Sequence, residues 1–232
     1  MYLYVIVQIG GDVGRILRHM LNASVIPKNI ANPSNMRRFL LCGNIERLTQ
    51  ALNSGSLTDN TNYIRRLTCQ YRRELALLDA GECGAFNRLG RAANSVHNSS
   101  SDVSTQFGFA HIEQDVATMI LDLSPGLKIV YVNEAFLTET GISQSKLLGR
   151  PVYDAFPDNP KAPESECVSH TFNAIKQTMK VNQPIILPDQ RYDIRNPDGN
   201  FVECYWRIEF LPLPNANEEV EFIKLKINKI FQ

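Results

Sequence analysis

The sequence predicts an α+β protein with two dissimilar parts, and three observations support this prediction. Residues 201–210 alternate polar and apolar side chains at period two, as a strand with one buried face does. Residues 63–78 instead repeat apolar side chains every three or four positions, which is typical of an amphipathic helix. Between these regions the chain becomes rich in Gly, Ser and Asn, and we place a linker at about residues 95–106. We therefore expect one domain over residues 1–105 and a second over residues 106–232.

The composition supports a folded protein whose halves carry opposite charge. With 44% hydrophobic and 21% charged residues among 232, the chain is an ordinary globular sequence with enough apolar residues for a buried core. The formal net charge is zero, which argues against a protein that binds polyanions through its overall charge. Residues 1–110 nevertheless hold 12 Lys or Arg against 7 Asp or Glu, and the remainder holds 12 against 17. This asymmetry favours two units with different surfaces.

Cysteine usage and the N-terminal segment favour a reducing compartment. The five cysteines form no CxxC pair and no histidines stand at zinc-finger spacing, so we expect neither a disulfide framework nor a structural metal site. The opening apolar stretch, MYLYVIVQI, is about nine residues long and has no basic lead, which makes it too short to span a bilayer and a poor signal peptide. We interpret it as a buried strand and expect a cytoplasmic protein without a membrane segment.

The first domain is predicted to be mostly helical or a small α/β unit. Residues 10–14, Gly-Gly-Asp-Val-Gly, open a helix after the first strand but lack the Lys-Ser or Lys-Thr of a phosphate loop, so a tight turn is the better interpretation. A helix from Ser34 and the helix over residues 63–78 follow. The outer face of the latter is basic, and such a face is usually solvated, so we do not expect it to bind nucleic acid. Its basic residues are Arg65, Arg66, Arg72 and Arg73.

The second domain is predicted to begin with a β-hairpin and to end with a long strand. The first two strands are expected over residues 117–123 and about 128–132, joined by a Ser-Pro-Gly turn. Asn133 can cap a helix that begins at Glu134, and Gly149 punctuates the short helical turns that follow. One longer helix is expected over residues 165–181, and the final strand is expected over residues 220–230.

A second hairpin is predicted within residues 192–206, YDIRNPDGNFVECYW. Pro197 presets φ for the second position of a type I turn, and Gly199 accepts the positive φ that often closes such a turn. Cys204 and Trp206 share the apolar face of the exit strand. We interpret them as core residues, with a pocket wall as the alternative.

These segments together resemble the PAS (Per-Arnt-Sim) domain family. The stretch IVYVNEAFLTETGISQSKLLGRPVYDAFPDNP is similar to the front half of that family, in which an I-x-Y-V-N-x-A-F strand and helix start is followed by T-G-x-S and L-L-G-R. FPDNP together with RYDIRNPDGNFVECYW resembles a subgroup found in bacterial signalling proteins, such as the sensor histidine kinases of two-component systems. The resemblance covers about residues 112–230, and its several segments in register make it specific.

The resemblance implies a five-stranded antiparallel sheet that, with short helices and one longer helix, encloses a small cavity. The residues alone lead to a similar picture, because a sheet with one apolar face must be covered and the helices between residues 134 and 181 are available to cover it. We name two groups of candidate residues. The pocket candidates are Tyr131, Phe136, Tyr153, Phe172 and Trp206. The structural motif residues are Asn133, Gly149, Pro197 and Gly199.

No cofactor or catalytic group is predicted. Flavin-binding relatives carry a reactive cysteine soon after the Gly-Arg pair, whereas Pro151 to Phe156 contain none, so covalent flavin chemistry is rejected. Haem-binding relatives carry a histidine on the longer helix, but His170 stands near the start of that helix, so haem is not expected. Asp154, Asp158 and Glu164 have no paired histidine or catalytic motif, so we do not expect an enzyme.

We expect a sensory and signalling protein whose PAS domain binds a small ligand or partner and relays the change through dimer or domain contacts. The partner is a second copy or a signalling protein. The alternative is a transcriptional regulator that binds DNA through its basic first half, although the loop between its two helices is long for a helix-turn-helix. A first half that only supports the second also stays open. The sequence leaves open the ligand, the output partner, and whether the chain is the sensor part of a larger protein.

Overall fold

The computed structural model describes residues 33–54, 61–85, 113–162, 165–196, 198–215 and 217–230. The expected N-terminal strand, the glycine turn at residues 10–14, the linker and Pro197 lie outside these residues. The helices are α2 (Pro33–Asn53), α3 (Thr61–Cys83), α5 (Glu134–Thr140), α6 (Val152–Ala155) and α7 (Cys167–Val181), with a 3-10 turn, η2, at Gln144–Lys146. The strands are β1 (Ala117–Asp122), β2 (Ile129–Val132), β3 (Ile185–Ile186), β4 (Gln190–Arg191), β5 (Ile194–Arg195), β6 (Phe201–Val202), β7 (Tyr205–Pro214) and β8 (Val220–Ile230).

An antiparallel sheet with the strand order β2-β1-β8-β7-β3 forms the centre of the fold, which confirms the predicted α+β class. The fifth position differs from the expected single strand, because the short strands β3 and β4 both pair with β7. Pro188 stands between them and lacks the N–H that a continuous ladder needs, which accounts for the break. Strands β5 and β6 form a separate two-stranded pair.

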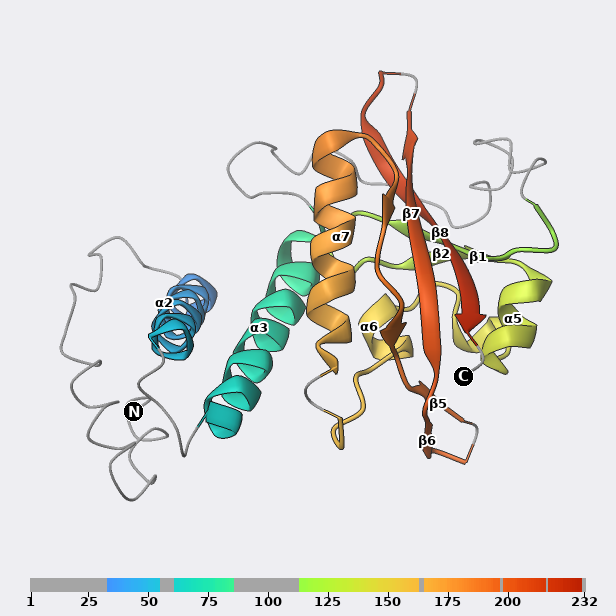
Figure 1. Ribbon diagram of the computed structural model, residues 1–232. Coiled ribbons are helices and arrows are strands. Elements are labelled where there is room, and N and C mark those ends of the chain that lie inside the picture. Colours follow the sequence, from blue (N-terminus) through green and yellow to red (C-terminus); the bar gives the residue numbers. More distant parts are fainter. Residues whose placement is uncertain are drawn as a thin grey trace.

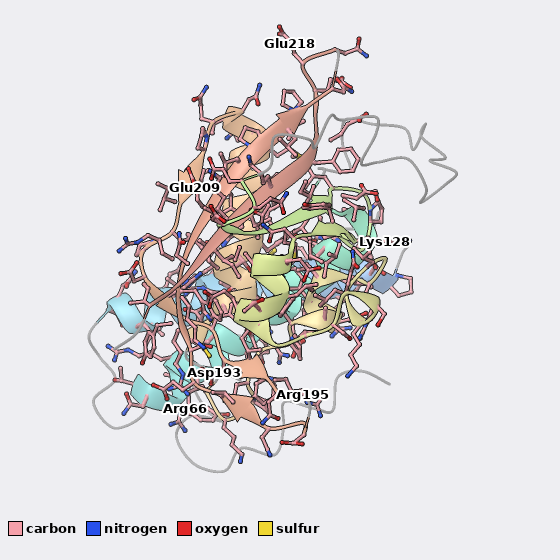
Figure 2. The ribbon with its side chains drawn as sticks, turned by 90° about the vertical axis from the view of Figure 1, so that its right-hand side faces the viewer. Arg66, Lys128, Asp193, Arg195, Glu209 and Glu218 are labelled. Atoms are coloured by element: carbon pink, nitrogen blue, oxygen red, sulfur yellow. The ribbon has the colours of Figure 1, made fainter. Side chains whose placement is uncertain are left out.

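The two faces of the sheet differ as the period-two pattern predicts. Trp206, Ile208 and Phe210 of β7 are buried on the inner face, which α5, α6 and α7 cover (Figure 1). Val202 departs from this pattern because β6 has left the main sheet, and its side chain is exposed. The β7–β8 ribbon is long, and Figure 2 shows Glu218 at one end of it and Asp193 near the other.

Helix α3 packs against α7, so that α7 lies between α3 and the sheet (Figure 1). The buried residues of α3 are Ile64, Thr68, Ala76 and Ala80, which are four or eight positions apart and so share one face of the helix. Apart from Ile64 they are small residues, which allow neighbouring elements to approach closely. The C-terminal end of α3 is also bonded to the first hairpin. The Gly126 N–H donates to the Ala80 carbonyl at 2.8 Å, which joins α3 to the β1–β2 turn.

Helix α2 packs on α3 and forms a helical hairpin with it. Arg38 on α2 donates to Asp79 at 2.6 Å and to Glu82 at 3.3 Å, which ties the two helices together through charge. Leu41 and Leu48 are the buried residues of α2, whereas Leu40 is exposed. Among the described residues, no helix is both long enough and apolar enough to cross a membrane.

Candidate functional site

A cavity of about 60 Å³ lies between the inner face of the sheet and helices α5, α6 and α7. The sheet contributes its inward side chains, which are Met119, Leu121, Trp206, Ile208, Leu225 and Ile227. The helices contribute Phe136, Thr140, Val152, Tyr153, Thr171 and Ile175. Phe156, Tyr192 and Ile194 complete the wall. Among the residues that the structure describes, no charged side chain lines the cavity.

Asn133 positions the α5 side of this cavity. Its side-chain oxygen accepts hydrogen bonds from the Phe136 N–H at 3.0 Å, as a helix cap, and from the Thr118 N–H of β1 at 2.9 Å. Its amide donates to the Val116 carbonyl at 2.8 Å. Asn133 is 3% exposed, so these bonds are protected from water. One side chain thus fixes α5 and Phe136 relative to the first strand.

The connection from α5 to α6 is fixed to strand β2 by backbone bonds. Gly149 has a φ of 77°, a left-handed conformation that glycine adopts without cost, and its N–H donates to the Ile129 carbonyl at 2.8 Å. The Ile129 N–H in turn donates to the Arg150 carbonyl at 3.0 Å. This pair of bonds brings Val152 and Tyr153 over the sheet. The predicted structural role of Gly149 therefore has a specific geometry.

The polar groups of the cavity wall are bonded to one another or to the backbone. The Tyr192 hydroxyl donates to the Phe156 carbonyl at 2.6 Å, and the Trp206 indole N–H donates to the Tyr192 carbonyl at 2.8 Å. The Tyr153 and Thr171 hydroxyls lie 3.3 Å apart. Burial raises the pKa of Tyr153 and of Tyr192 above the ordinary value, so both phenols are neutral.

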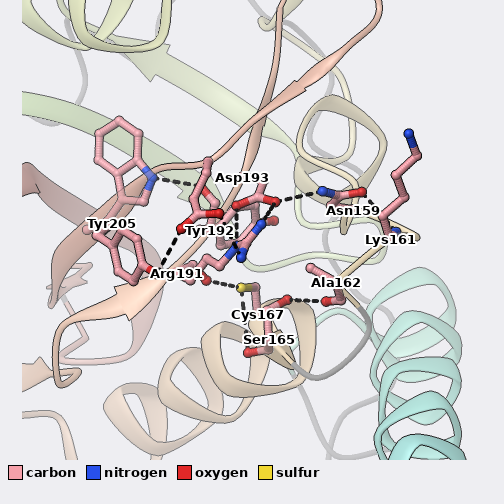
Figure 3. A network of polar contacts seen from close by, with 11 residues as sticks. Asn159, Lys161, Ala162, Ser165, Cys167, Arg191, Tyr192, Asp193 and Tyr205 are labelled. Atoms are coloured by element: carbon pink, nitrogen blue, oxygen red, sulfur yellow. Dashed lines mark hydrogen bonds and ion pairs between the residues drawn. The ribbon is translucent and has the colours of Figure 1, made fainter. Parts of the chain in front are cut away.

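Figure 3 shows a network of charged and polar groups around Tyr192, a residue of the cavity wall. Asp193 accepts hydrogen bonds from Arg191 at 2.8 and 2.9 Å and from the Asn159 amide at 2.6 Å. Burial by itself would raise the pKa of Asp193, but the bonds from Arg191 and Asn159 outweigh it and hold that pKa below its ordinary value. Arg191 also pairs with Glu203 at 2.9 Å. The network fixes the segment that carries Tyr192.

A second charged cluster joins the α6–α7 connection to α3. Arg73 of α3 lies 3.1 Å from Asp158, and Arg72 lies 3.3 Å from Glu166. Asp158 also accepts a hydrogen bond at 3.3 Å from the Val168 N–H in the first turn of α7. Burial raises the pKa of Asp158, and the nearby Arg73 only partly offsets this effect. Two arginines of the predicted basic face therefore pair with carboxylates of the second domain while their side chains stay partly exposed, and nothing in this arrangement of described residues supports DNA binding by that face.

The five predicted pocket residues occupy different places. Phe136, Tyr153 and Trp206 line the cavity. Phe172 is buried in the adjoining core, with its ring centroid 6.5 Å from that of Tyr153 in an edge-to-face arrangement. Tyr131 pairs opposite Ile120 and packs in the cluster on the outer face of the sheet, so it does not line the cavity. Ligand contact by the three lining residues stays a prediction.

Gly199, the remaining motif residue that the structure describes, does not line the cavity. Gly199 has a φ of 86° and its N–H donates to the Asn196 carbonyl at 2.9 Å, which closes the predicted β5–β6 turn. Cys204 is buried in the core beside Trp206.

Sequence reasoning did not name Leu225 and Ile227 as lining residues, although they alternate with Lys224 and Lys226 on β8. This alternation of apolar and charged residues along the strand indicates that Leu225 and Ile227 face the core.

The described residues fit neither a flavin nor a haem at this position. A tricyclic flavin ring is larger than benzene, which occupies a cavity of about 150 Å³ in another protein, whereas this cavity measures about 60 Å³ and has no cysteine in its wall. Cys167 lies outside the cavity wall, and burial raises its thiol pKa to about 12. His170 is half-exposed beside Glu166 and does not line the cavity. Within the described part of the chain, no three His, Cys, Asp or Glu side chains gather as a metal site.

Comparison with known proteins gives a match to one family model and to several solved structures. The family model of the PAS domain matches residues 115–225. The chain is similar to a LOV protein of Rhodobacter sphaeroides, at 13% identity and a TM-score of 0.39, over 52% of this chain and 62% of that one. It is also similar to the light-state Aureochrome1 LOV structure, at 21% identity and a TM-score of 0.38, over 57% of this chain and 91% of that one.

A third similar structure is a variant of Drosophila melanogaster Cycle PAS-B with bound glycerol, at 16% identity and a TM-score of 0.38, over 49% of this chain and 99% of that one. The chain spans less than two thirds of the length of the Rhodobacter protein. No curated protein matches the chain.

Proposed function

Because residues 115–225 form a PAS domain, we propose that this part of the chain is a sensory module that binds a small molecule in the cavity and passes the change to α3 or to a second protein. The proposal assigns no catalytic step to the module. The partner is a second copy of the chain or a separate signalling protein. Signalling of the two-component type is one setting in which such a module would act.

The cavity is the observation that supports ligand binding. Protein cores are close-packed, and voids larger than a water molecule are few. Leaving about 60 Å³ empty costs about 1.4 kcal/mol at the usual cavity penalty per unit volume. A molecule that fills the space recovers part of that free energy, so a ligand of the right size would stabilise this packing.

A relay from the cavity to α3 is supported by a short series of contacts. Phe156 lines the cavity, and Asp158 follows it by two positions. Asp158 contacts Arg73 of α3 and the first turn of α7. Helix α7 is a second connection, because it carries residues of the cavity wall and also packs against α3. A ligand that binds one arrangement of this segment more tightly than another would shift the docking of α3.

The test is to identify what the purified chain carries. The full chain is purified without added cofactor, its absorption spectrum is recorded, and a solvent extract is analysed by mass spectrometry. The matched variant Ile175→Phe places extra volume in the cavity wall. We expect a molecule that is extracted from the natural chain and depleted from the variant. Equal extracts from two folded proteins, together with no ligand that stabilises only the natural chain, would contradict the proposal.

The relay is tested separately by hydrogen exchange. Backbone amides of α3 are measured with and without the extracted molecule. We expect a change of protection in α3 that disappears in an Arg73→Met variant, because that variant removes the contact to Asp158. Light scattering on the same samples measures whether the chain forms a dimer. An unchanged α3 would leave the partner protein as the output and remove α3 from the relay.

A further inference from the structure

We infer that the cavity takes a small, uncharged, apolar molecule, of the size of xenon or a short hydrocarbon or halocarbon. This inference rests on the proposed function, because it names the ligand class of the same cavity. Three properties of the wall support it: the volume, the absence of charge, and the state of the hydrogen-bond donors.

The volume limits the ligand to a few heavy atoms. An engineered cavity of about 150 Å³ holds benzene. At about 60 Å³, this cavity has less than half that volume. Nucleotides, flavins and amino-acid side chains with rings are therefore too large.

The charges around the cavity are unavailable to a ligand. Asp158 and Asp193, which follow the wall residues Phe156 and Tyr192 in sequence, are not part of the wall, and each already has a cationic partner. Those partners are Arg73 and Arg191. An ion placed in the cavity would lose its hydration without gaining a counter-charge, which is strongly unfavourable.

Side-chain donors in the wall are all engaged within the protein. The Thr140 and Thr171 hydroxyls donate to the Phe136 and Cys167 carbonyls, each at 2.8 Å. This leaves the Tyr153 hydroxyl to donate to the Thr171 oxygen.

The other two donors are the Tyr192 hydroxyl and the Trp206 indole, and both donate to backbone carbonyls. A carboxylate, phosphate or carbonyl oxygen of a ligand would therefore find no donor, and burying it unpaired would cost affinity.

The test compares apolar and polar probes of similar size. Xenon binding to the full chain is followed by the ¹²⁹Xe chemical shift and by thermal unfolding under xenon pressure, with acetate and glycerol as polar probes. We expect a saturable xenon shift and a raised midpoint of unfolding, and no effect of acetate or glycerol. Two variants narrow the cavity: Ile175→Phe, and the milder Val152→Leu in case the first fails to fold. Each should lose the saturable xenon signal while its circular dichroism stays native.

A third variant enlarges the same space. Leu225→Ala removes wall atoms from β8, and we expect it to bind benzene where the natural chain does not. Acetate or glycerol binding that Val152→Leu abolishes would overturn the apolar class and leave the sensory function standing. Absence of binding by every probe, in the natural chain and in folded Leu225→Ala alike, would overturn both proposals.

Discussion

The Nε atom of Arg73 lies 3.1 Å from the Oδ2 atom of Asp158, so α3 places a cation against a carboxylate whose side chain is only 7% exposed. The nitrogen is itself buried and makes no aligned hydrogen bond, so the contact is an ion pair. Asp158 belongs to the segment that joins α6 to α7, beside the cavity. The pair therefore connects the first half of the chain to the α6–α7 connection of the PAS domain.

Replacing Arg73 with Met tests how much this ion pair contributes to the free energy of unfolding. The variant keeps an apolar stem but removes the ion pair, so that within the described residues the Val168 N–H is left as the hydrogen-bond donor to the Asp158 carboxylate. We expect a loss of about 1–3 kcal/mol in the free energy of unfolding at pH 7, the usual cost of a poorly satisfied buried acceptor. Urea unfolding measures it. The loss should shrink near pH 4, because the pKa of Asp158 is already raised and loss of the cation raises it further.

Arg66→Met on the same helix is the matched control. Its side chain is exposed, and we expect a change within about 0.5 kcal/mol. A loss at Arg66 equal to that at Arg73 would show that helix composition, and not the ion pair, sets the stability of α3.

Replacement by alanine should have opposite effects on stability at two glycines near the end of α3. Gly84 has a φ of 62°, and a Cβ there would stand close to the Leu123 carbonyl of the first hairpin. We expect Gly84→Ala to destabilise the protein by about 2–4 kcal/mol through left-handed strain and this clash. Gly81 lies inside the helix with open space around it. Gly81→Ala should stabilise by about 0.5–1 kcal/mol.

Thermal unfolding of both alanine variants measures this difference. Equal midpoints would mean that the end of α3 is not held against the first hairpin as described. A lowered midpoint for Gly84→Ala with unchanged xenon binding would separate this contact from the cavity.

Asn133 fixes α5 to the first strand through hydrogen bonds of both its amide oxygen and its amide nitrogen. Asn133→Ala removes the cap of α5 and the bonds to Thr118 and Val116. We expect a loss of about 2–4 kcal/mol, the cost of a cap plus one or two buried groups left unpaired. Asn133→Asp keeps the hydrogen-bond acceptor and loses the donor to the Val116 carbonyl. Its free energy of unfolding should therefore lie between those of the natural chain and of Asn133→Ala. An Asp variant less stable than the Ala variant would show that the cap contributes little.

Local patterns in the sequence predicted the first hairpin, the helices and the long strands of the second domain, but not the break between β3 and β4 or the separate β5–β6 pair. The alternation on β7 and β8, the Asn133 cap and the positive φ of Gly149 and Gly199 each depend on neighbours within a few residues. The site was harder to predict. In the IVYV segment of β2 both alternating positions are apolar, so the pattern could not tell that Tyr131 faces the outer cluster.

Contacts between distant parts of the chain left no local signal. Arg73 and Asp158 stand on different elements, and the sequence showed only an arginine face and a proline loop. The same limit applies to Arg72 and Glu166. A helix surface of this kind looks solvated until its partner is known, because charge spacing on one helix says nothing about a carboxylate elsewhere.

The hydrogen bonds to Asp193 should make the stability contributed by this carboxylate depend on pH in the acid range. Its pKa in the folded protein lies below the ordinary value of about 3.9. A carboxyl with a lowered folded pKa contributes stability that is complete above the unfolded value and is lost as pH falls through the folded value. We therefore expect Asp193→Asn to be less stable than the natural chain at pH 7 by about 1.5–3 kcal/mol, since it loses charged hydrogen bonds to Arg191.

That difference should be constant from pH 7 to about pH 5 and should narrow below about pH 4, where the Asp193 carboxyl of the unfolded chain takes up a proton before that of the folded chain does. Urea unfolding across this range measures it. Asp189→Asn is the control, because its pair with Arg207 is exposed and such pairs contribute about 0–1 kcal/mol. A difference for Asp193 that persists unchanged to pH 3 would mean that the ionised carboxylate is not what holds the Arg191–Asn159 network together.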